Sequence, residues 1–294
     1  MMPLKPAMTY EQQVARLIEE HGLVIGDRDE AREILSRVNY YRLSAYGIGL
    51  KRTDDKEKYI EGTSLARLYR LYVFDGYFRS ALFFLIEQAE IEIRTQVAYH
   101  FSLKYGPEGY CDVANFADRL DSKGESIHGG VMARFRDEVR RQAALPCVVH
   151  HKTQYGGHFP AWAAVELFTF GMVSSLYSIM KSEDQKVIAD FYSAKNNHLK
   201  SWLLSLVEVR NRCAHYGRIY NMPLAQAPFL YTEHALYRGR KVFPVILVLR
   251  RMMSRRPAWT TFLATLEGLI ENHPEVNLGF IGFPENWLDV LKGE

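Results

Sequence analysis

Apolar residues recur every three or four positions along most of this chain, which is the period of an amphipathic helix. The longest such segment follows Thr63 and Ser64, either of which is a suitable N-cap, and runs to Phe101. Its apolar positions are Leu65, Leu68, Tyr72, Phe78, Leu82, Ile86, Ala89, Ile93, Val97 and Phe101. A helix of about 40 residues extends roughly 60 Å, and Gly76 is a candidate for a kink in it.

Shorter helices are expected on both sides of this segment. Thr9 and Gln12 have the spacing of a capping box for a helix over residues 10–21, and Asp27 or Asp29 precedes another that ends near residue 37. Further helices are expected over residues 131–144, 160–180, 197–215, 232–253 (interrupted at Pro244) and 258–272, and a short one from residue 182. The helix over residues 160–180 begins with Pro160 and is apolar around most of its circumference.

Polar residues and glycines mark the connections between these helices. We expect loops over residues 51–62 and after Pro146, and irregular structure over residues 106–130. No two segments with the period of a strand are joined by a hairpin turn. The pattern therefore predicts an all-α protein, with residues 1–60 as a small helical subdomain and residues 61–294 as a bundle of long helices.

Composition adds limits on the class of protein. The chain has 294 residues, of which 48% are hydrophobic and 24% charged, and this balance is typical of a soluble globular protein. A net charge of +3 excludes a polycation that coats nucleic acid, so any contact with RNA must come from a local site. The three cysteines form no CxxC pair, and no apolar stretch approaches the roughly 20 residues of a membrane span. We expect a cytoplasmic protein without membrane contact.

The sequence offers little for a metal ion or a cofactor. His150, His151 and His158 are close in sequence, but adjacent side chains point apart and no carboxylate or cysteine stands at ligand spacing. A solvated loop is the favoured interpretation of these histidines. The HExxH, P-loop, GxGxxG and GxSxG motifs are absent. We therefore expect no metal ion and no cofactor.

Residues 208–221 (EVRNRCAHYGRIYN) carry the strongest candidate chemistry. A histidine such as His215 can transfer a proton near neutral pH, and a guanidinium such as that of Arg210 can hold a phosphate through two hydrogen bonds. This combination suits RNA cleavage through the ribose 2′-hydroxyl. Asn211 stands one helical turn before His215, where its amide is expected to orient the imidazole ring. Arg212 and Arg218 are further candidates for contact with RNA.

The spacing alone does not decide between catalysis and structure. Similar arginine–histidine pairs occur at two other places in the chain, about as often as chance allows. A helix end whose cations complement the helix dipole is the structural alternative. On a regular helix Arg210 lies about 140° around the axis from His215, so the two side chains diverge within one chain. Two copies facing each other across a two-fold axis would bring them together, which favours a homodimer.

Two other segments combine arginines with features of nucleic-acid contact. Tyr40, Arg42 and Tyr46 are candidates for stacking on single-stranded RNA, although core packing is the favoured role of the tyrosines. The arginines at positions 250, 251, 255 and 256 form a basic run that is suited to phosphates. A solvated helix end is the commoner meaning of such a run.

Four segments resemble signatures of the abortive-infection (Abi) proteins of the AbiD/AbiF type, which are similar to the HEPN superfamily of helical-bundle ribonucleases. They are NYYRLSAY (39–46), FPAWAAVELFTFGMVSSLYS (159–178), WLLSLVEVRNRCAHYGRIYN (202–221) and GFPENW (282–287), in family order. The third segment contains the Arg-Asn-x-x-x-His motif of the family. Tyr216 and Tyr220 depart from the residues that are common at their positions, but neither replaces a catalytic group.

The resemblance implies a HEPN-like bundle and a metal-independent endoribonuclease. Arg210 and His215 would be catalytic, with Asn211 in support, in an active site composed from both subunits of a homodimer. It also implies phage defence, in which cleavage of RNA halts growth, and in some relatives inhibition by an RNA or protein antitoxin. Two alternatives stay open: a catalytically silent HEPN adaptor that binds RNA or a protein, and a DNA-binding regulator with an N-terminal helix-turn-helix.

Overall fold

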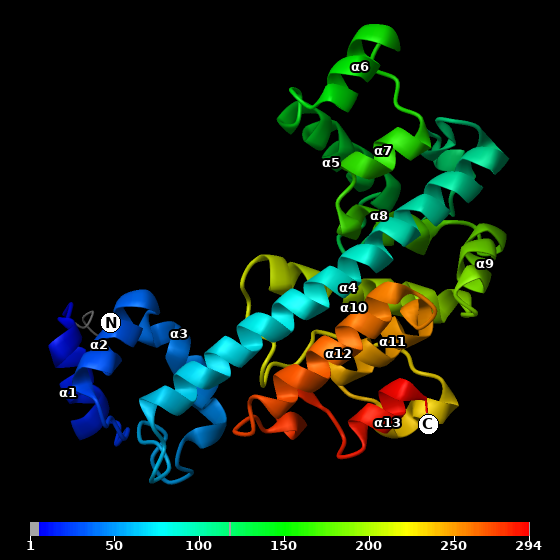
Figure 1. Cartoon of the computed structure of the whole chain (residues 1–294). Helices are drawn as coiled ribbons and strands as arrows, with labels where there is room; N and C mark the ends of the chain where they lie inside the picture. Colours follow the sequence, from blue (N-terminus) through cyan, green and yellow to red (C-terminus); the bar gives the residue numbers. More distant parts are fainter. Residues whose placement is uncertain (1–5, 118, 294) are drawn as a thin grey trace.

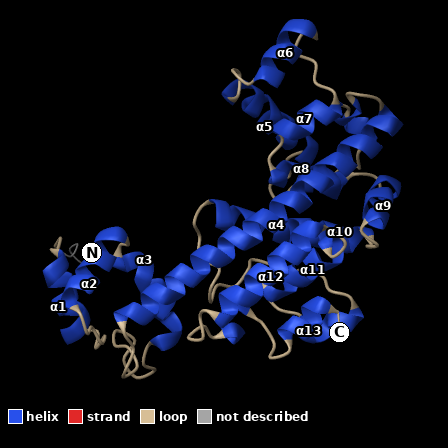
Figure 2. Ribbon diagram, in the orientation of Figure 1, coloured by secondary structure: helices blue, strands red, loops and turns tan. Residues whose placement is uncertain are grey.

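The computed structural model describes residues 6–117 and 119–293, and these residues form helices and connecting loops without a strand (Figure 2). This confirms the predicted all-α class. No helix within the described ranges is both long and apolar enough to cross a membrane. The first five residues assigned to the N-terminal subdomain lie outside the described residues.

The long helix predicted by the apolar period is α4, which spans Leu65–Tyr105 and runs through most of the length of the molecule (Figure 1). The Ser64 hydroxyl caps its first turn by accepting the N–H of Arg67 at 3.1 Å. The helix continues through Gly76 without the kink that the sequence suggested and ends at Gly106, whose φ is 81°. Because α10, α11 and α12 pack along it and the N-terminal helices cover its start, α4 positions the functional residues described below.

The N-terminal residues fold over the first two turns of α4. Helices α1 (Tyr10–Glu19) and α2 (Arg28–Arg37) have the predicted caps, a Thr9–Gln12 capping box and the Asp27 carboxylate. They are followed by α3 (Tyr40–Ser44) and a 3₁₀ turn, η1 (Ala45–Leu50). Their buried side chains form a core of their own, but Leu65 and Leu68 of α4 belong to it. Independent folding of residues 1–60 stays a prediction.

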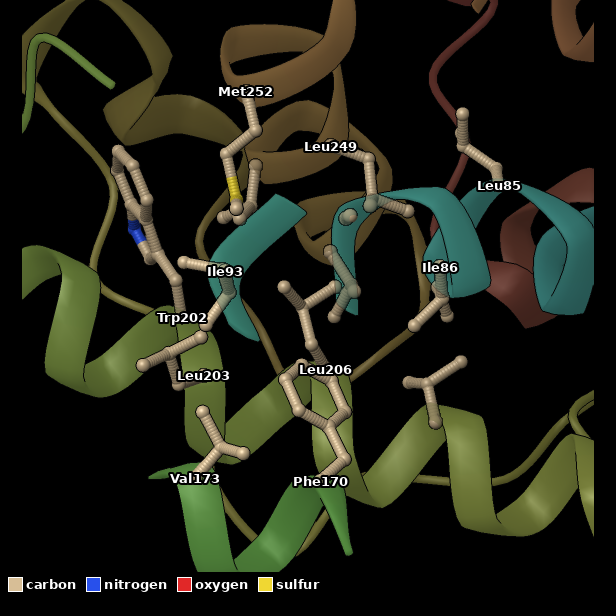
Figure 3. Packing of buried hydrophobic residues seen from close by; sticks show 14 of the residues in the cluster. Leu85, Ile86, Ile93, Phe170, Val173, Trp202, Leu203, Leu206, Leu249 and Met252 are labelled. Carbon is tan, nitrogen blue, oxygen red and sulfur yellow. The ribbon is translucent and has the colours of Figure 1, made fainter. Parts of the chain in front are cut away.

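The main core lies where α10, α11 and α12 pack beside α4 and where α8 meets α10. Figure 3 shows Ile86 and Ile93 of α4 facing Trp202 and Leu206 of α10, with Phe170 of α8 beneath them. The remaining elements are η2 (Gly109–Cys111), η3 (Val113–Asn115), α5 (Ile127–Arg141), α6 (Pro146–Gln154), α7 (Ala161–Leu167), α8 (Phe170–Ile179), α9 (Ser182–Phe191), α10 (Asn196–Ala214), η4 (Thr232–Tyr237), α11 (Phe243–Met253), α12 (Pro257–Glu271), η5 (Leu278–Ile281) and α13 (Trp287–Lys292).

The structure corrects three of the expected elements. The segment 232–253 is a 3₁₀ turn, η4, and a separate helix, α11, and Pro244 lies in the first turn of α11 rather than interrupting a helix. The segment after Pro146 is the helix α6, not a loop. Pro146 lies in its first turn, and the glycines of the segment, Gly156 and Gly157, follow the last residue of the helix, Gln154. The apolar segment 160–180 is not one helix but two, α7 and α8. Thr169 caps α8, and the side chain of Arg94 donates to the carbonyl oxygens of Val165 and Phe168 at the end of α7. The break therefore satisfies backbone groups that a continuous helix would have paired.

A buried carboxylate on α4 joins three distant parts of the chain. One oxygen of Asp75 accepts the backbone N–H groups of Ile219 and Tyr220, at 3.1 and 2.8 Å. The other accepts the hydroxyl of Tyr46 at 2.7 Å and pairs with Arg79, one turn further along α4. Burial raises the pKa of Asp75, whereas Arg79 and the hydrogen bonds oppose the rise. This carboxylate fixes the segment that follows α10 against α4 and η1.

Replacement of Asp75 by alanine is expected to lower the free energy of unfolding by about 3–5 kcal/mol. The change leaves the charge of Arg79 and three hydrogen-bond donors without their acceptor in the interior. Urea denaturation followed by circular dichroism measures the effect. Asp137→Ala is the matched control, because Asp137 is exposed and pairs with Arg140 at the surface, where such pairs contribute less than about 1 kcal/mol. Equal losses in both variants would contradict the account.

Candidate functional site

The candidate site lies at the C-terminal end of α10, where the chain turns sharply. His215 is the C-cap of the helix, and its N–H donates to the carbonyl oxygen of Asn211 at 3.0 Å. Tyr216 follows with a φ of 57°, a left-handed conformation that is uncommon for a residue with a side chain. The N–H of Gly217 then donates to the carbonyl oxygen of Arg212 at 2.7 Å. The turn leaves the side chains of His215 and Tyr216 exposed.

After the turn, the chain runs back along α10 and is tied to it by side chains of the helix. The carboxylate of Glu208 accepts the N–H of Ala225 at 2.9 Å and the guanidinium of Arg212 at 2.6 Å. Arg212 also donates to the carbonyl oxygen of Pro223 at 2.8 Å. Further along, the indole N–H of Trp202 donates to Phe229 at 2.6 Å. Arg212 is therefore bound within the fold, and its role in contacting RNA stays a prediction.

Arg210 is held against the long helix α4. Its Nε lies 3.3 Å from a carboxylate oxygen of Glu90, and its guanidinium lies 5.8 Å from the centre of the Phe83 ring. Glu90 is buried and also pairs with Arg94. About a third of the Arg210 side chain remains exposed. This guanidinium is thus fixed on one side and open to solvent on the other.

The structure does not bring the three predicted catalytic side chains together within one chain. Asn211 accepts a hydrogen bond from Nη1 of Arg210 at 3.3 Å, rather than contacting the ring of His215 as expected. Among the described residues, the His215 ring has no hydrogen-bond partner, and no contact joins it to Arg210. The divergence agrees with the separation of roughly 140° that five residues of a regular helix produce.

The N-terminal segment that contains Arg42 and Tyr46 contacts the turn at the end of α10. Arg42 donates to the carbonyl oxygen of Tyr216, and Arg218 donates to that of Ala45. Burial lowers the pKa of the Arg218 guanidinium. Tyr46 is buried and bonded to Asp75, so its ring does not offer the stacking surface that the sequence suggested.

Tyr40 is also occupied within the fold. It is half-buried, and its hydroxyl lies 3.1 Å from that of Tyr59. The environments of Tyr40 and Tyr46 favour core packing, which the sequence pattern offered as the alternative to stacking on RNA. Arg42 remains half-buried at the edge of the turn.

A cavity of about 430 Å³ opens beside the end of α10, between this helix and α4. Its lining includes Arg79, Phe83, Phe84, Glu87, Cys213 and Tyr216. Phe84 and Tyr216 are exposed, at 43% and 71%. Aromatic rings beside a guanidinium are the kind of surface on which an unpaired base stacks.

Sequence reasoning missed the acidic residues that organise this site. Asp75 and Glu90 both fall within the apolar stripe of α4, where Leu68, Phe78 and Ile86 alternate with them at steps of three and four. A carboxylate on a buried helix face requires a partner, and each has an arginine four residues later. An acidic residue on the apolar face with an arginine four residues later is therefore the sequence pattern that indicates these buried ion pairs. In the described part of the chain, no three His, Cys, Asp or Glu residues are grouped as a metal site.

Cys213, which packs against this cavity from α10, is expected to resist alkylation in the folded protein. Burial raises the pKa of its thiol to about 12, from a usual value of 9.0, so thiolate is roughly 1,000-fold rarer at pH 8. Mass spectrometry after brief treatment with iodoacetamide should find Cys147, which is exposed, modified first. Cys213 should react only after unfolding. Equal reaction rates in the native state would contradict the packing of α10 against α4.

Comparison with known proteins places the chain in a family. No curated protein and no solved structure matches it. The model of a family described as Abi-like protein matches residues 33–221, a range that includes α4 and the whole of α10 with the Arg-Asn-x-x-x-His motif. The matched range covers more than half of the chain. The chain therefore belongs to the family of Abi-like proteins.

Proposed function

We propose that this Abi-like protein is an endoribonuclease of the HEPN type that acts in abortive infection. Membership of the family suggests a role in phage defence. The observation that carries the proposed activity is the end of α10, where an exposed histidine stands beyond a guanidinium that is fixed on α4. The AbiD/AbiF type, the HEPN-like bundle and the cytoplasmic location belong to the same proposal.

The proposed reaction is transesterification of the RNA backbone. The ribose 2′-oxygen attacks phosphorus as the bond to the 5′-oxygen breaks, which leaves a 2′,3′-cyclic phosphate and a 5′-hydroxyl. His215 takes the proton of the 2′-hydroxyl and returns it to the leaving 5′-oxygen. Its freedom from other hydrogen bonds among the described residues suits this task. Arg210 binds the phosphate and stabilises the charge on the pentacoordinate phosphorus.

In this proposal Glu90 and Asn211 orient the guanidinium of Arg210. Glu90 contacts Nε, and Asn211 accepts from Nη1, so the guanidinium is oriented before RNA binds. A guanidinium that is already ordered loses less conformational freedom when it holds a phosphate. Asn211 is thus a positioning residue for the arginine, whereas the sequence alone suggested one for the histidine.

A second copy of the chain would bring Arg210 and His215 to one phosphate. Tyr77, Phe84 and Ile91 on α4 are 62%, 43% and 53% exposed, and their spacing of seven residues places them on one side of the helix. This apolar surface adjoins the cavity at the end of α10, because Phe84 lines it. We propose that it forms a two-fold interface and that each catalytic centre takes residues from both subunits.

Cleavage of single-stranded RNA in the presence of EDTA is expected to depend on both proposed catalytic residues. His215→Ala removes proton transfer and should lower the rate about 10²–10⁴-fold. Arg210→Ala removes the phosphate contact and should lower it about 10²–10³-fold. His150→Ala, at an exposed histidine of α6, is the control and should cleave as the wild type does. Gel electrophoresis of a labelled oligonucleotide measures the rates, and equal cleavage by the His215→Ala protein would reject the assignment.

Mixing the two inactive variants tests the composite site. Random exchange of subunits makes about half of the dimers mixed, and each mixed dimer contains one intact centre if arginine and histidine come from different chains. The mixture should then recover about a quarter of wild-type activity. Rates that stay at the level of the separate variants would place both residues of each centre in one chain.

A catalytically silent adaptor, which binds RNA or a protein partner, is the second candidate function. The ion pair between Arg210 and Glu90 favours it, because a neutralised arginine has less charge to offer a transition state. Expression of the wild type and of the Arg210→Ala, His215→Ala double variant in a bacterium distinguishes the two functions. Growth arrest by both proteins indicates binding, whereas arrest by the wild type alone indicates catalysis. An antitoxin of RNA or protein that holds the activity in check would be found by its rescue of growth.

A further inference from the structure

A large basic cleft lies away from the end of α10, between the C-terminal ends of α9 and α11 and the last helix, α13. Its volume is about 820 Å³. Four arginines line it, namely Arg250, Arg251, Arg255 and Arg256, from the end of α11 and the turn that leads to α12. These are the basic residues that the sequence shows as a run. The fold directs them into one cleft.

Among the described residues that line this cleft, positive charge exceeds negative charge. Among the described residues of the lining, Glu233 is the sole carboxylate, and it lies 3.2 Å from Arg251. Arg256 pairs with Glu92 of α4 at 2.8 Å. Within the described ranges, Arg250 and Arg255 have no ion pair. A cleft in which two guanidinium groups have no carboxylate partner among the described residues is suited to an anion.

Two of the guanidinium groups are already ordered. Arg250 donates its Nε–H to the carbonyl oxygen of Leu291 at 3.0 Å. Arg251 lies 4.2 Å over the ring of Tyr231 and donates to the carbonyl oxygen of Ser193 at 2.9 Å. A planar guanidinium that is fixed in this way matches the oxygen atoms of a phosphate with little loss of conformational freedom.

Aromatic side chains line the same cleft and point to a ligand that carries a ring. Phe191 at the end of α9 is 46% exposed, and His234 and Tyr237 of η4 form another wall. Burial lowers the pKa of His234 and so favours its neutral form. The volume is within the range of about 300–1,000 Å³ that small-molecule sites occupy. Guanidinium groups beside aromatic rings fit a nucleotide better than an acidic peptide, which offers no base to stack.

We propose that this cleft binds the phosphate groups of a nucleotide, either a free nucleoside triphosphate or the phosphorylated 5′ end of an RNA chain. The site is separate from the proposed catalytic one. Arg251 contacts Ser193 just before α10 begins, whereas His215 follows the end of the helix, and the 19 residues of α10 extend about 28 Å. The proposal therefore does not depend on ribonuclease activity.

Binding measurements with the whole chain test this site. The probes are ATP and two RNA oligonucleotides of one sequence, with a 5′-triphosphate and with a 5′-hydroxyl, and binding is followed by isothermal titration calorimetry. Arg255→Ala should weaken binding of the phosphorylated probes at least tenfold, because one charge-assisted contact is lost. Arg255 is exposed and has no hydrogen bond among the described residues, so the variant should fold normally. Arg136→Ala, at an exposed arginine of α5, is the matched control and should bind as the wild type does.

The outcomes separate the sources of phosphate and the alternatives. Binding of ATP that Arg255→Ala weakens supports a free nucleotide. Tighter binding of the 5′-triphosphate RNA than of the 5′-hydroxyl RNA, without binding of ATP, supports an RNA end. Absence of binding by both phosphorylated probes overturns the proposal. An equal loss of affinity in Arg136→Ala also overturns it. Tighter binding of polyglutamate than of the phosphorylated probes overturns it as well and would indicate an acidic protein partner. ATP binding is measured without RNA, so its loss in Arg255→Ala is independent of the proposed cleavage.

Discussion

The carboxylate of Asp75 accepts hydrogen bonds from three separate parts of the chain, and the arrangement of the candidate site follows from them. It lies on α4 and binds Arg79 on the same helix, the hydroxyl of Tyr46, and two backbone N–H groups just after the turn that ends α10. A buried charge of this kind is tolerated only when its partners are complete. The requirement therefore fixes the return of the chain after His215 relative to α4.

Glu90, four turns further along α4, has a corresponding role for the arginine of the motif. It pairs with Arg94, which caps the end of α7, and with Arg210, which would bind phosphate. Two acidic residues on one helix thus hold the histidine end and the arginine of α10 in separate orientations. Their divergence within one chain is the reason for proposing a second copy, with the exposed residues Tyr77, Phe84 and Ile91 of α4 as the proposed interface.

The sequence predicted the parts of this arrangement that are local. The apolar period located α4, and the candidate caps located the starts of three helices: Thr9 for α1, Asp27 of the pair Asp27 and Asp29 for α2, and Ser64 of the pair Thr63 and Ser64 for α4. It could not predict that Glu90 binds Arg210, because the contact joins residues 120 positions apart and depends on how α10 packs on α4. For the same reason Asn211 was assigned to the nearest histidine rather than to the arginine beside it. The break between α7 and α8 likewise depends on Arg94, a residue from another helix.

The central claim is that this protein cleaves RNA by attack of the 2′-hydroxyl, with proton transfer by His215. The chemical ends of the fragments test it most directly, because they record which bond broke and which nucleophile attacked. Mass spectrometry of the products from a defined oligonucleotide should find 2′,3′-cyclic phosphate or 3′-phosphate on one fragment and a 5′-hydroxyl on the other. Fragments with a 3′-hydroxyl and a 5′-phosphate would contradict the account, since they require water to attack in place of the ribose.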